Sequence, residues 1–324
     1  MEFYKNKKVL VTGGCGFIGS HLAEKLLNLG AIVTIIDNLE RGYVINLRFL
    51  LKHNFYNIDL REKSVLFNDL VAKQDYVFHL AFKVGGVIYT NSKPYFSEIW
   101  RDGTRINLNV IDACCRSNTK LLFMSSACVY SSKLSKPIKE YESTSYQPDD
   151  AYGWSKLVGE LQVKWAWENG LLDEAVIIRP FNIYGEREYY DREYGHALPV
   201  LCSKAIEYPD KPFTVHGDGT NIRCFLYVSD MVNSLLEAMK KIDFPSPINI
   251  GSKEAVSINE LVKKIIKLSK KQIKIKYIKV STTGAKRRIP NLDYAEKLLG
   301  FKSTVSLDEG LKKTYEWIKN DLIR

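Results

Sequence analysis

Two short segments of the sequence carry side chains that could move a proton and a hydride. Tyr152 and Lys156 lie four residues apart in D-D-A-Y-G-W-S-K, so a helix would place both on one face. An ammonium beside the phenol would stabilise the phenolate and lower the pKa of the tyrosine from about 10 towards that of a general base. Ser126 follows the apolar run at 121–124 and could add a hydroxyl to the same substrate oxygen. The set predicts chemistry at a carbon that loses or gains hydride.

A glycine-rich turn near the amino terminus predicts the dinucleotide that such chemistry needs. Gly13, Gly16 and Gly19 form G-x-x-G-x-x-G between a predicted strand at Lys8–Thr12 and a helix that Gly30 would end. Glycines let the backbone approach a pyrophosphate, and the start of the helix offers unpaired N–H groups and the positive end of its dipole. This arrangement is typical of a Rossmann-type dinucleotide site.

An acid at the end of the next predicted strand indicates which dinucleotide binds. Asp37 follows the strand at 31–36, about twenty residues after the glycines, where a carboxylate can bind the ribose hydroxyls of the adenosine. The same charge would repel a 2′-phosphate. The sequence therefore predicts NAD rather than NADP as the cofactor.

Strands and helices alternate through the first half of the chain, which predicts βαβ units and a parallel sheet. Further strands are predicted at 55–58, 76–80, 121–124 and 174–178, and helices at 102–116 and around Tyr152. The fold class is α/β, a Rossmann-type doubly wound parallel sheet with a smaller carboxyl-terminal lobe. Ligands of such sheets bind at the carboxyl ends of the strands. The residues expected there are the glycine loop, Asp37, Asp59, Ala81 and Ser126.

Composition indicates an ordinary globular protein. The 324 residues are 45% hydrophobic and 26% charged. No apolar run approaches the roughly 20 residues of a membrane span, and the first residues lack the apolar core of a signal peptide, so we expect a cytoplasmic protein without a membrane partner. The six cysteines have no zinc spacing, which predicts reduced thiols and no metal.

The net charge of +10 leaves two interpretations open. An acid-free run at 262–288 holds 11 basic residues and could bind nucleic acid. The run includes I-K-I-K-Y-I-K-V, however, whose alternation is typical of a strand with one solvated face. We favour that interpretation and predict no nucleic-acid partner, since positive charge also suits a substrate that carries a pyrophosphate.

Together these residues resemble the extended short-chain dehydrogenase/reductase family, which contains the nucleotide-sugar epimerases and dehydratases. The resemblance covers nearly the whole chain through T-G-G-C-G-F-I-G-S-H-L, S-S-A-C-V-Y, Y-G-W-S-K, R-P-F-N-I-Y-G and G-D-G-T-N-I-R-C-F-L-Y-V-S-D. It implies an NAD-binding domain at 1–180 and a lobe for a nucleotide-diphosphate sugar, mainly at 181–324. Part of 218–252 would return to the first domain. It also implies a homodimer formed by the helices of Asp102 and Tyr152.

The resemblance assigns a role to further residues. Those expected to bind the cofactor are Gly13, Gly16, Phe17, Ile18, Gly19, Asp37, Asn38, Asp59, Leu60, Leu80, Ala81, Tyr152 and Lys156. Those expected to bind the substrate are Lys83, Gly85, Ser126, Asn182, Lys204, Arg223 and Arg287. The two arginines would hold the pyrophosphate, because a guanidinium donates two parallel hydrogen bonds to phosphate oxygens.

The residues after Ser126 indicate the branch of the family. Dehydratases carry an acid pair before V-Y, where this sequence has Ala127 and Cys128, so dehydration is not expected. The motif is most similar to those of GDP-mannose 3,5-epimerases and GDP-L-fucose synthases, which use this cysteine as an acid/base. His196 aligns with the histidine of the synthases, whereas S-S-A-C and Asp37 follow the epimerases. The catalytic residues that this resemblance implies are Ser126, Cys128, Tyr152, Lys156 and His196.

The leading hypothesis is an NAD-dependent nucleotide-sugar epimerase that forms a transient 4-keto sugar and inverts C3 and C5 of a GDP-hexose or heptose. A ketone at C4 acidifies these neighbouring C–H bonds, and a thiol and an imidazole can exchange the protons near neutral pH. A simple 4-epimerase and a fucose-synthase-like epimerase/reductase are the alternative enzymes. A cofactor-binding scaffold or RNA-binding protein on the same fold is the non-enzymatic alternative.

Overall fold

The structure is a computed structural model that describes residues 2–48, 54–90, 93–280 and 284–323. Its centre is a seven-stranded sheet in the order β11-β6-β5-β4-β1-β2-β3, and every neighbouring pair is parallel. This order confirms the predicted doubly wound α/β fold. The strands are β1 Lys8–Thr12, β2 Ile32–Asp37, β3 Phe55–Asn57, β4 Tyr76–His79, β5 Lys120–Met124, β6 Ala175–Pro180 and β11 Pro247–Ile250.

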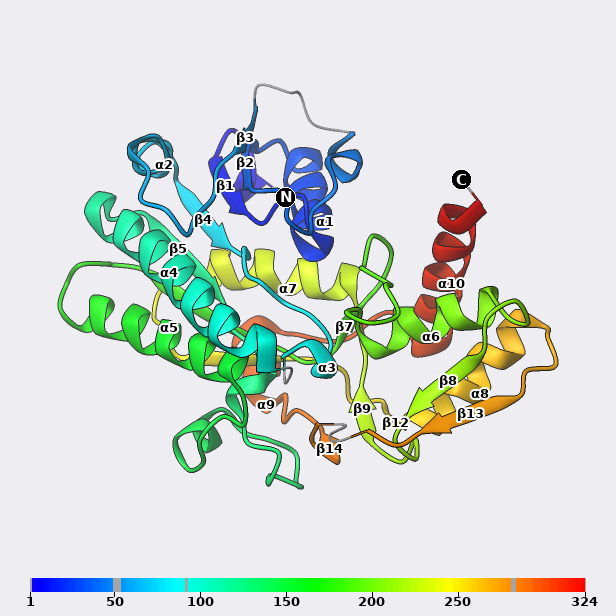
Figure 1. Cartoon of the computed structure of the whole chain (residues 1–324). Coiled ribbons are helices and arrows are strands. Elements are labelled where there is room, and N and C mark those ends of the chain that lie inside the picture. Colours follow the sequence, from blue (N-terminus) through cyan, green and yellow to red (C-terminus); the bar gives the residue numbers. More distant parts are fainter. Residues whose placement is uncertain (1, 49–53, 91–92, 281–283, 324) are drawn as a thin grey trace.

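Helices cover both faces of this sheet (Figure 1). Alternate residues of β1 enter two separate cores because successive side chains of a strand point to opposite faces. Val9 and Val11 pack with α1 (Phe17–Asn28) and α7 (Val228–Lys241). Leu10 packs in the other core with α2 (Val65–Val71), α4 (Lys93–Ser117) and α5 (Ala151–Glu168). Burial on both faces explains why the strands read as continuous apolar runs.

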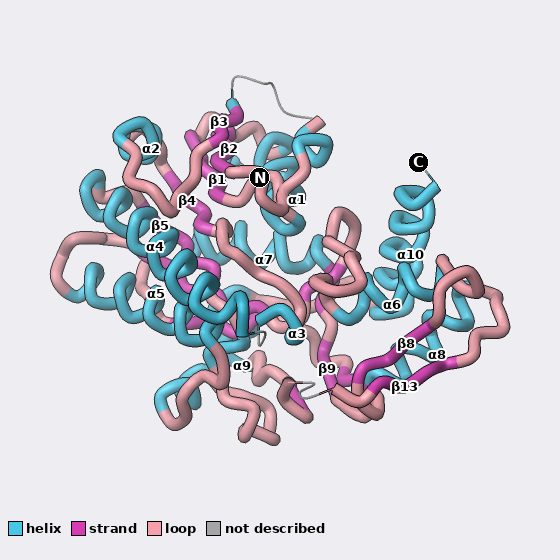
Figure 2. The backbone as a smooth tube through the Cα atoms, viewed as in Figure 1, coloured by secondary structure: helices cyan, strands magenta, loops and turns pink. Residues whose placement is uncertain are grey.

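The second half of the chain builds a lobe beside the sheet and also returns to it (Figure 2). The lobe contains α6 Ala197–Ile206, β8 Phe213–His216, β9 Ile222–Cys224, β12 Ala255–Ser257, α8 Ile258–Ser269, β13 Ile275–Ile278, β14 Arg287–Arg288 and α10 Leu307–Ile323. Between them the chain crosses back, so that α7 packs on α1 and β11 pairs with β6. Two short strands, β7 (Ile183–Tyr184) and β10 (Leu226–Tyr227), pair with each other where the chain passes between the two parts.

Two local predictions have different outcomes. Part of the basic run forms β13, which pairs in parallel with β8, so the predicted strand is confirmed. Lys276 is exposed as expected, but Tyr277 on the other face is exposed too, so the strand does not have one buried face. The predicted start of a helix at Asp102 is wrong, because α4 begins at Lys93. Gly103 lies inside this helix, where a Cβ would come within 2.2 Å of the Phe82 ring. The glycine is therefore required by packing rather than by the end of a helix.

No helix among the described residues is both long enough and apolar enough to cross a membrane. All six cysteines are free thiols, and four of them are buried. Within the described ranges no cluster of three or more histidine, cysteine or acidic side chains is arranged to hold a metal ion.

A buried ion pair joins α5 to the sheet. The guanidinium of Arg179 on β6 donates to both carboxylate oxygens of Glu160, at 2.8 and 2.5 Å, and both side chains are almost fully buried. The same guanidinium donates to Tyr130 and to the carbonyl oxygen of Glu140. Because α5 carries Tyr152 and Lys156, this network fixes the helix that presents them.

We expect Glu160→Ala to lower the free energy of unfolding by about 3–5 kcal/mol, because it leaves the Arg179 charge buried without its carboxylate. Urea unfolding followed by circular dichroism measures the change. Lys164→Ala on the exposed side of the same helix is the control, with an expected effect within about 0.5 kcal/mol. Equal effects of the two substitutions would contradict the assigned importance of the pair.

Candidate active site

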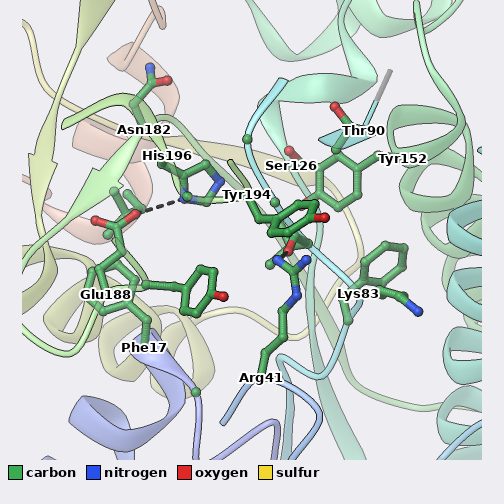
Figure 3. Close-up of a pocket in the computed structure, with 18 of the residues that line it drawn as sticks. Phe17, Arg41, Lys83, Thr90, Ser126, Tyr152, Asn182, Glu188, Tyr194 and His196 are labelled. Carbon is green, nitrogen blue, oxygen red and sulfur yellow. Dashed lines mark hydrogen bonds and ion pairs between the residues drawn. The ribbon is translucent and has the colours of Figure 1, made fainter. Parts of the chain in front are cut away.

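A single cleft of about 660 Å³ lies at the carboxyl ends of the strands and extends to the lobe. Its lining includes every residue predicted to bind cofactor and every predicted catalytic residue. Figure 3 shows Tyr152 and Ser126 on one side of this cleft and His196 and Glu188 on the other. Of the predicted substrate residues, all line the cleft except Arg287.

The loop between β1 and α1 is packed so tightly that its glycines cannot carry side chains. Gly13 has φ +69°, and a Cβ there would lie 2.8 Å from the backbone of Ala81. A Cβ on Gly19 would lie 2.2 Å from the carbonyl oxygen of Gly13. No side chain caps α1, because its N-cap is Gly16. The N–H groups of its first turn and the positive end of the helix dipole fit a pyrophosphate.

Asp37 is fixed at the wall of the cleft by two backbone groups. Its Oδ1 accepts from the N–H of Leu39 at 2.8 Å, and its Oδ2 accepts from the N–H of Cys15 at 3.0 Å. Burial raises the pKa of Asp37, and these two hydrogen bonds act against the rise. Asn38 and Asp59, which were also predicted to bind the cofactor, line the cleft too. The glycine cradle and this carboxylate together fit NAD.

Tyr152 lies in the first turn of α5, which begins because the N-cap Asp150 accepts from the N–H of Gly153 at 2.7 Å. The expectation that Lys156 lowers the pKa of Tyr152 is wrong for this structure. Burial raises the pKa of the phenol, and only a hydrogen bond with Ser126 acts in the opposite direction. The helical spacing brings the two residues to one face, but desolvation outweighs any charge effect.

The ammonium of Lys156 makes its hydrogen bond to the backbone and not to the Tyr152 hydroxyl. Its Nζ donates to the carbonyl oxygen of Met124 at 2.8 Å and lies 3.9 Å from the centre of the Phe82 ring. Burial lowers the pKa of Lys156 to about 7. The same Phe82 ring meets Tyr152 edge-on, with 5.2 Å between the ring centres. Phe82 therefore packs against both members of the pair, a contact that the sequence did not reveal.

Cys128 lies in a 3₁₀ turn, Ala127–Val129, that follows β5. The Ser126 hydroxyl caps this turn by accepting from the N–H of Cys128 at 3.0 Å. Burial and the carboxylate of Asp150 raise the pKa of the Cys128 thiol, whereas Arg288 and Arg223 act to lower it. The thiol is half-buried and lines the cleft with Tyr152. The structure thus brings the predicted serine, cysteine and tyrosine together.

His196 is the N-cap of α6, and its loop packs against the loop after β4. The N–H of Gly86 donates to the carbonyl oxygen of Tyr194 at 2.8 Å, and a Cβ on Gly86 would lie 2.4 Å from the Gly195 oxygen. Nδ1 of His196 lies 2.9 Å from a carboxylate oxygen of Glu188. Glu188 was missed in the sequence because a lone acid in a charged loop carries no signal.

The predicted pyrophosphate contacts require one correction. Arg287 is exposed and lies outside the cleft lining, whereas its neighbour Arg288 lines the cleft. Successive side chains of β14 point to opposite faces, so the prediction was one residue out of register. Arg288 donates to the carbonyl oxygens of Ala127 and Tyr130 and so also holds the turn that carries Cys128. Burial and Arg288 lower the pKa of Arg223 to about 10.

The other predicted substrate residues line the cleft through different contacts. Lys83 pairs with Glu40 at 2.8 Å and with Glu98 at 3.1 Å. Lys204 is buried and donates to the carbonyl oxygen of Thr214, and burial together with Arg192 lowers its pKa to about 8. The remaining two, Gly85 and Asn182, also line the cleft.

Comparison with known proteins agrees with this geometry. The family model described as "NAD dependent epimerase/dehydratase family" matches residues 9–251. The chain belongs to this family. The family resemblance seen in the sequence and the predicted cofactor, NAD, are thereby confirmed, and the protein is an enzyme of the nucleotide-sugar epimerase/dehydratase type.

Relatives within the family differ in their reactions. UDP-N-acetyl-alpha-D-glucosaminuronate decarboxylase of Bacillus cytotoxicus is 34% identical, over 97% of this chain and 99% of its own length. GDP-mannose 3,5-epimerase of Arabidopsis thaliana is 32% identical, over 98% of this chain and 84% of its own. The structure of UDP-glucuronic acid 4-epimerase from Bacillus cereus with UDP-glucuronic acid and NAD has a TM-score of 0.84 at 29% identity, covering 97% of this chain and 99% of that one. These comparisons establish the family, whereas its members catalyse different reactions.

We expect the protein to bind NAD more tightly than NADP, and Asp37→Asn to narrow that preference by about tenfold, or about 1.4 kcal/mol. The amide keeps an oxygen acceptor but no longer repels a 2′-phosphate. Calorimetric titration with each dinucleotide measures the ratio. Asp112→Asn, on the exposed face of α4, is the control and should leave it unchanged. An unchanged ratio of NAD to NADP affinity in Asp37→Asn would contradict the role of Asp37 in selecting the cofactor.

Proposed function

We propose that this enzyme epimerises a nucleotide-diphosphate sugar through a transient 4-keto intermediate, inverting C3, C5 or both. The preferred substrate in this proposal is a GDP-mannose-like hexose or heptose. One observation carries the proposal: the thiol of Cys128 and the imidazole of His196 line the same cleft as Tyr152. Inversion at C4 alone would require neither of these proton-exchanging groups.

The glycine loop at Gly13 and Gly16 and the carboxylate of Asp37 would hold NAD, which would supply a reversible hydride acceptor for C4 of the sugar. Tyr152 is the proposed acceptor for the proton of the C4 hydroxyl, a role that requires its phenolate form. Burial opposes that form by raising the pKa of the phenol, and the hydrogen bond with the Ser126 hydroxyl favours it. Lys156 donates from its Nζ to the Met124 carbonyl oxygen at the end of β5, which ties α5, the helix that also carries Tyr152, to that strand. The ketone that results makes the C3 and C5 protons acidic, because the carbanion delocalises as an enolate.

Cys128 and His196 then exchange those ring protons. A group on one face of the sugar removes the proton, and a group on the other face supplies a new one, which inverts the centre. The raised pKa of the Cys128 thiol keeps it protonated near neutral pH, so it suits the role of proton donor. His196 on the other side of the cleft then suits the role of acceptor (Figure 3).

Cationic groups of the lobe suit the rest of the substrate. Arg223 and Arg288 lie near the turn of Cys128, as their influence on its thiol indicates, and are proposed to hold the pyrophosphate. Lys204 and Asn182 line the part of the cleft built by the lobe and are proposed to contact nucleotide and sugar. The preference for a GDP-sugar follows from the resemblance of the cysteine motif, and the 32% identical Arabidopsis enzyme supports it.

Decarboxylation is the second candidate, favoured by the 34% identical relative. A uronate substrate oxidised at C4 becomes a β-keto acid, in which the C5–C6 bond can break and release CO₂ while its electron pair forms the enolate. Both reactions therefore share the step that Tyr152 assists. They differ in the group that leaves C5.

Incubation of the enzyme with GDP-mannose, UDP-glucose or UDP-glucuronate in deuterated water separates the candidates. Deuterium at C3 or C5 of recovered GDP-sugar supports the proposal. Inversion at C4 without ring label indicates a 4-epimerase, net consumption of added NADPH indicates an epimerase/reductase, and CO₂ from the uronate indicates a decarboxylase. Binding of RNA without any sugar turnover would indicate a scaffold. Each of these four results would overturn the proposed reaction.

We expect Cys128→Ala to reduce deuterium incorporation by at least about 10²-fold, the usual contribution of a positioned acid/base. Oxidation at C4 should continue, so NADH absorbance accumulates on the enzyme. Tyr152→Phe is the matched comparison and should lose both exchange and NADH formation. Full exchange in Cys128→Ala would refute the role of the thiol.

We also propose a homodimer formed through α4 and α5, which lie side by side on one face of the sheet (Figure 1). Large apolar side chains are exposed on both helices: Phe96, Trp100 and Leu108 on α4, and Leu161 and Trp165 on α5. Leu161 and Trp165 are spaced four residues apart and so share one stripe of α5. A second copy of this pair would cover them.

Analytical ultracentrifugation tests the dimer. The wild-type protein should sediment at twice its chain mass of 37.1 kDa, and Leu161→Lys together with Trp165→Lys should give the monomer. Val65→Lys changes an exposed apolar side chain on α2 and should leave the dimer intact. A monomeric wild-type protein at micromolar concentration would rule the interface out.

A further inference from the structure

Glu188 is a buried carboxylate that the steps described above do not use. It lies in the loop between β7 and α6, its side chain is 3% exposed, and it lines the cleft. Its Oε1 lies 2.9 Å from Nδ1 of His196, and its Oε2 has no hydrogen-bond partner among the described residues. Burial raises the pKa of Glu188, whereas His196 and the N–H of Gly185 act against the rise. Burial of a charged carboxylate is energetically unfavourable unless the charge is paired and hydrogen-bonded.

The imidazole of His196 depends on this carboxylate for its orientation. The backbone of His196 is fixed, because its carbonyl oxygen accepts from the N–H of Val200 at 3.2 Å and the preceding Gly195 packs against Gly86. The side chain itself is 49% exposed, so packing does not hold the ring. Among the described residues, Glu188 is the partner that the structure gives to the ring nitrogens.

The contact also decides which ring nitrogen carries the proton. Burial opposes the ionisation of Glu188, whereas His196 and the N–H of Gly185 favour it. In its ionised form the carboxylate only accepts hydrogen bonds, so Nδ1 is the donor. In the neutral imidazole Nε2 is then without a proton and can accept one. A histidine in water prefers the opposite tautomer, with the proton on Nε2, which would be unable to accept a proton there.

We propose that Glu188 is a positioning residue that holds His196 in the Nδ1–H tautomer, so that Nε2 is the acceptor for a ring proton of the sugar. In that step the sugar C–H bond breaks, its electron pair remains as the enolate, and the proton forms a new bond to Nε2. The imidazolium that results lies beside the Glu188 carboxylate, which stabilises its charge. The acceptor role rests on the proposed function, whereas the tautomer of His196 does not.

Nitrogen NMR of the NAD-bound protein labelled with ¹⁵N-histidine tests the tautomer directly. The chain has five histidines, and His196→Asn identifies the signals of His196. We expect the wild-type spectrum to show a protonated Nδ1 and a bare Nε2, and Glu188→Ala to shift the population towards a protonated Nε2. Glu188→Asp keeps the carboxylate and should restore part of the wild-type spectrum. Signals of His79, which is buried between Thr12 and Asn107, serve as an unchanged reference.

Kinetics in deuterated water test the consequence. Glu188→Ala should lower the rate of ring-proton exchange by at least about tenfold and leave the formation of NADH unchanged, a division that loss of folding would not produce. A wild-type His196 with its proton on Nε2 overturns the proposal without any variant, as does an unchanged exchange rate in Glu188→Ala. If the tautomer shifts as expected but the wild-type enzyme exchanges no ring proton, the proposed reaction fails and the positioning by Glu188 stands.

Discussion

The parallel pairing of the central strands is the constraint on which the site depends. Because β1 pairs with β2 on one side and with β4 on the other, the three loops that follow these strands meet at one edge of the sheet. Gly13, Asp37 and Ala81 stand at the starts of those loops and line one cleft, although they are far apart in the sequence. The next two strands, β5 and β6, extend the same edge to Ser126 and the lobe. An antiparallel strand at any of these places would carry its loop to the opposite edge.

Burial sets the chemistry of this edge more strongly than charge does. Phe82 covers the space between Lys156 and Tyr152, and the apolar surroundings raise the pKa of the phenol and lower that of Lys156 to about 7. Of these two groups only Lys156, whose pKa lies near neutrality, changes its protonation state easily at neutral pH. Cys128 lies under the same influence, with Asp150 and two arginines pulling its pKa in opposite directions. Along the wall formed by β5 and α5, the pKa of each titratable group therefore depends on burial and on the neighbouring groups.

The lobe supplies the other wall of the cleft. The family fold is shared by decarboxylases, 3,5-epimerases and 4-epimerases, so the sheet alone does not select a reaction. In the proposed function, the side chains that face the sugar select the reaction. In this chain those candidates are a thiol on the sheet side and an imidazole–carboxylate pair on the lobe side. The contact of Gly86 with Tyr194 and Gly195 joins the two walls and fixes their separation.

The sequence by itself determined the fold, the cofactor and the catalytic side chains proposed for the cleft, but only a minority of the residues that line it. Glycines that approach a backbone, an acid at the end of a strand and a Tyr-x-x-x-Lys pair are local signals, since each depends on residues close together in the chain. The tertiary structure decided what depends on distant neighbours. Glu188 pairs with His196 only because the loop after β7 folds back on α6. Arg288 lines the cleft and Arg287 does not, because successive side chains of the two-residue strand β14 point to opposite faces. The raised pKa of Tyr152 likewise follows from burial, because desolvation depends on everything that packs around a group and not only on its neighbours in sequence.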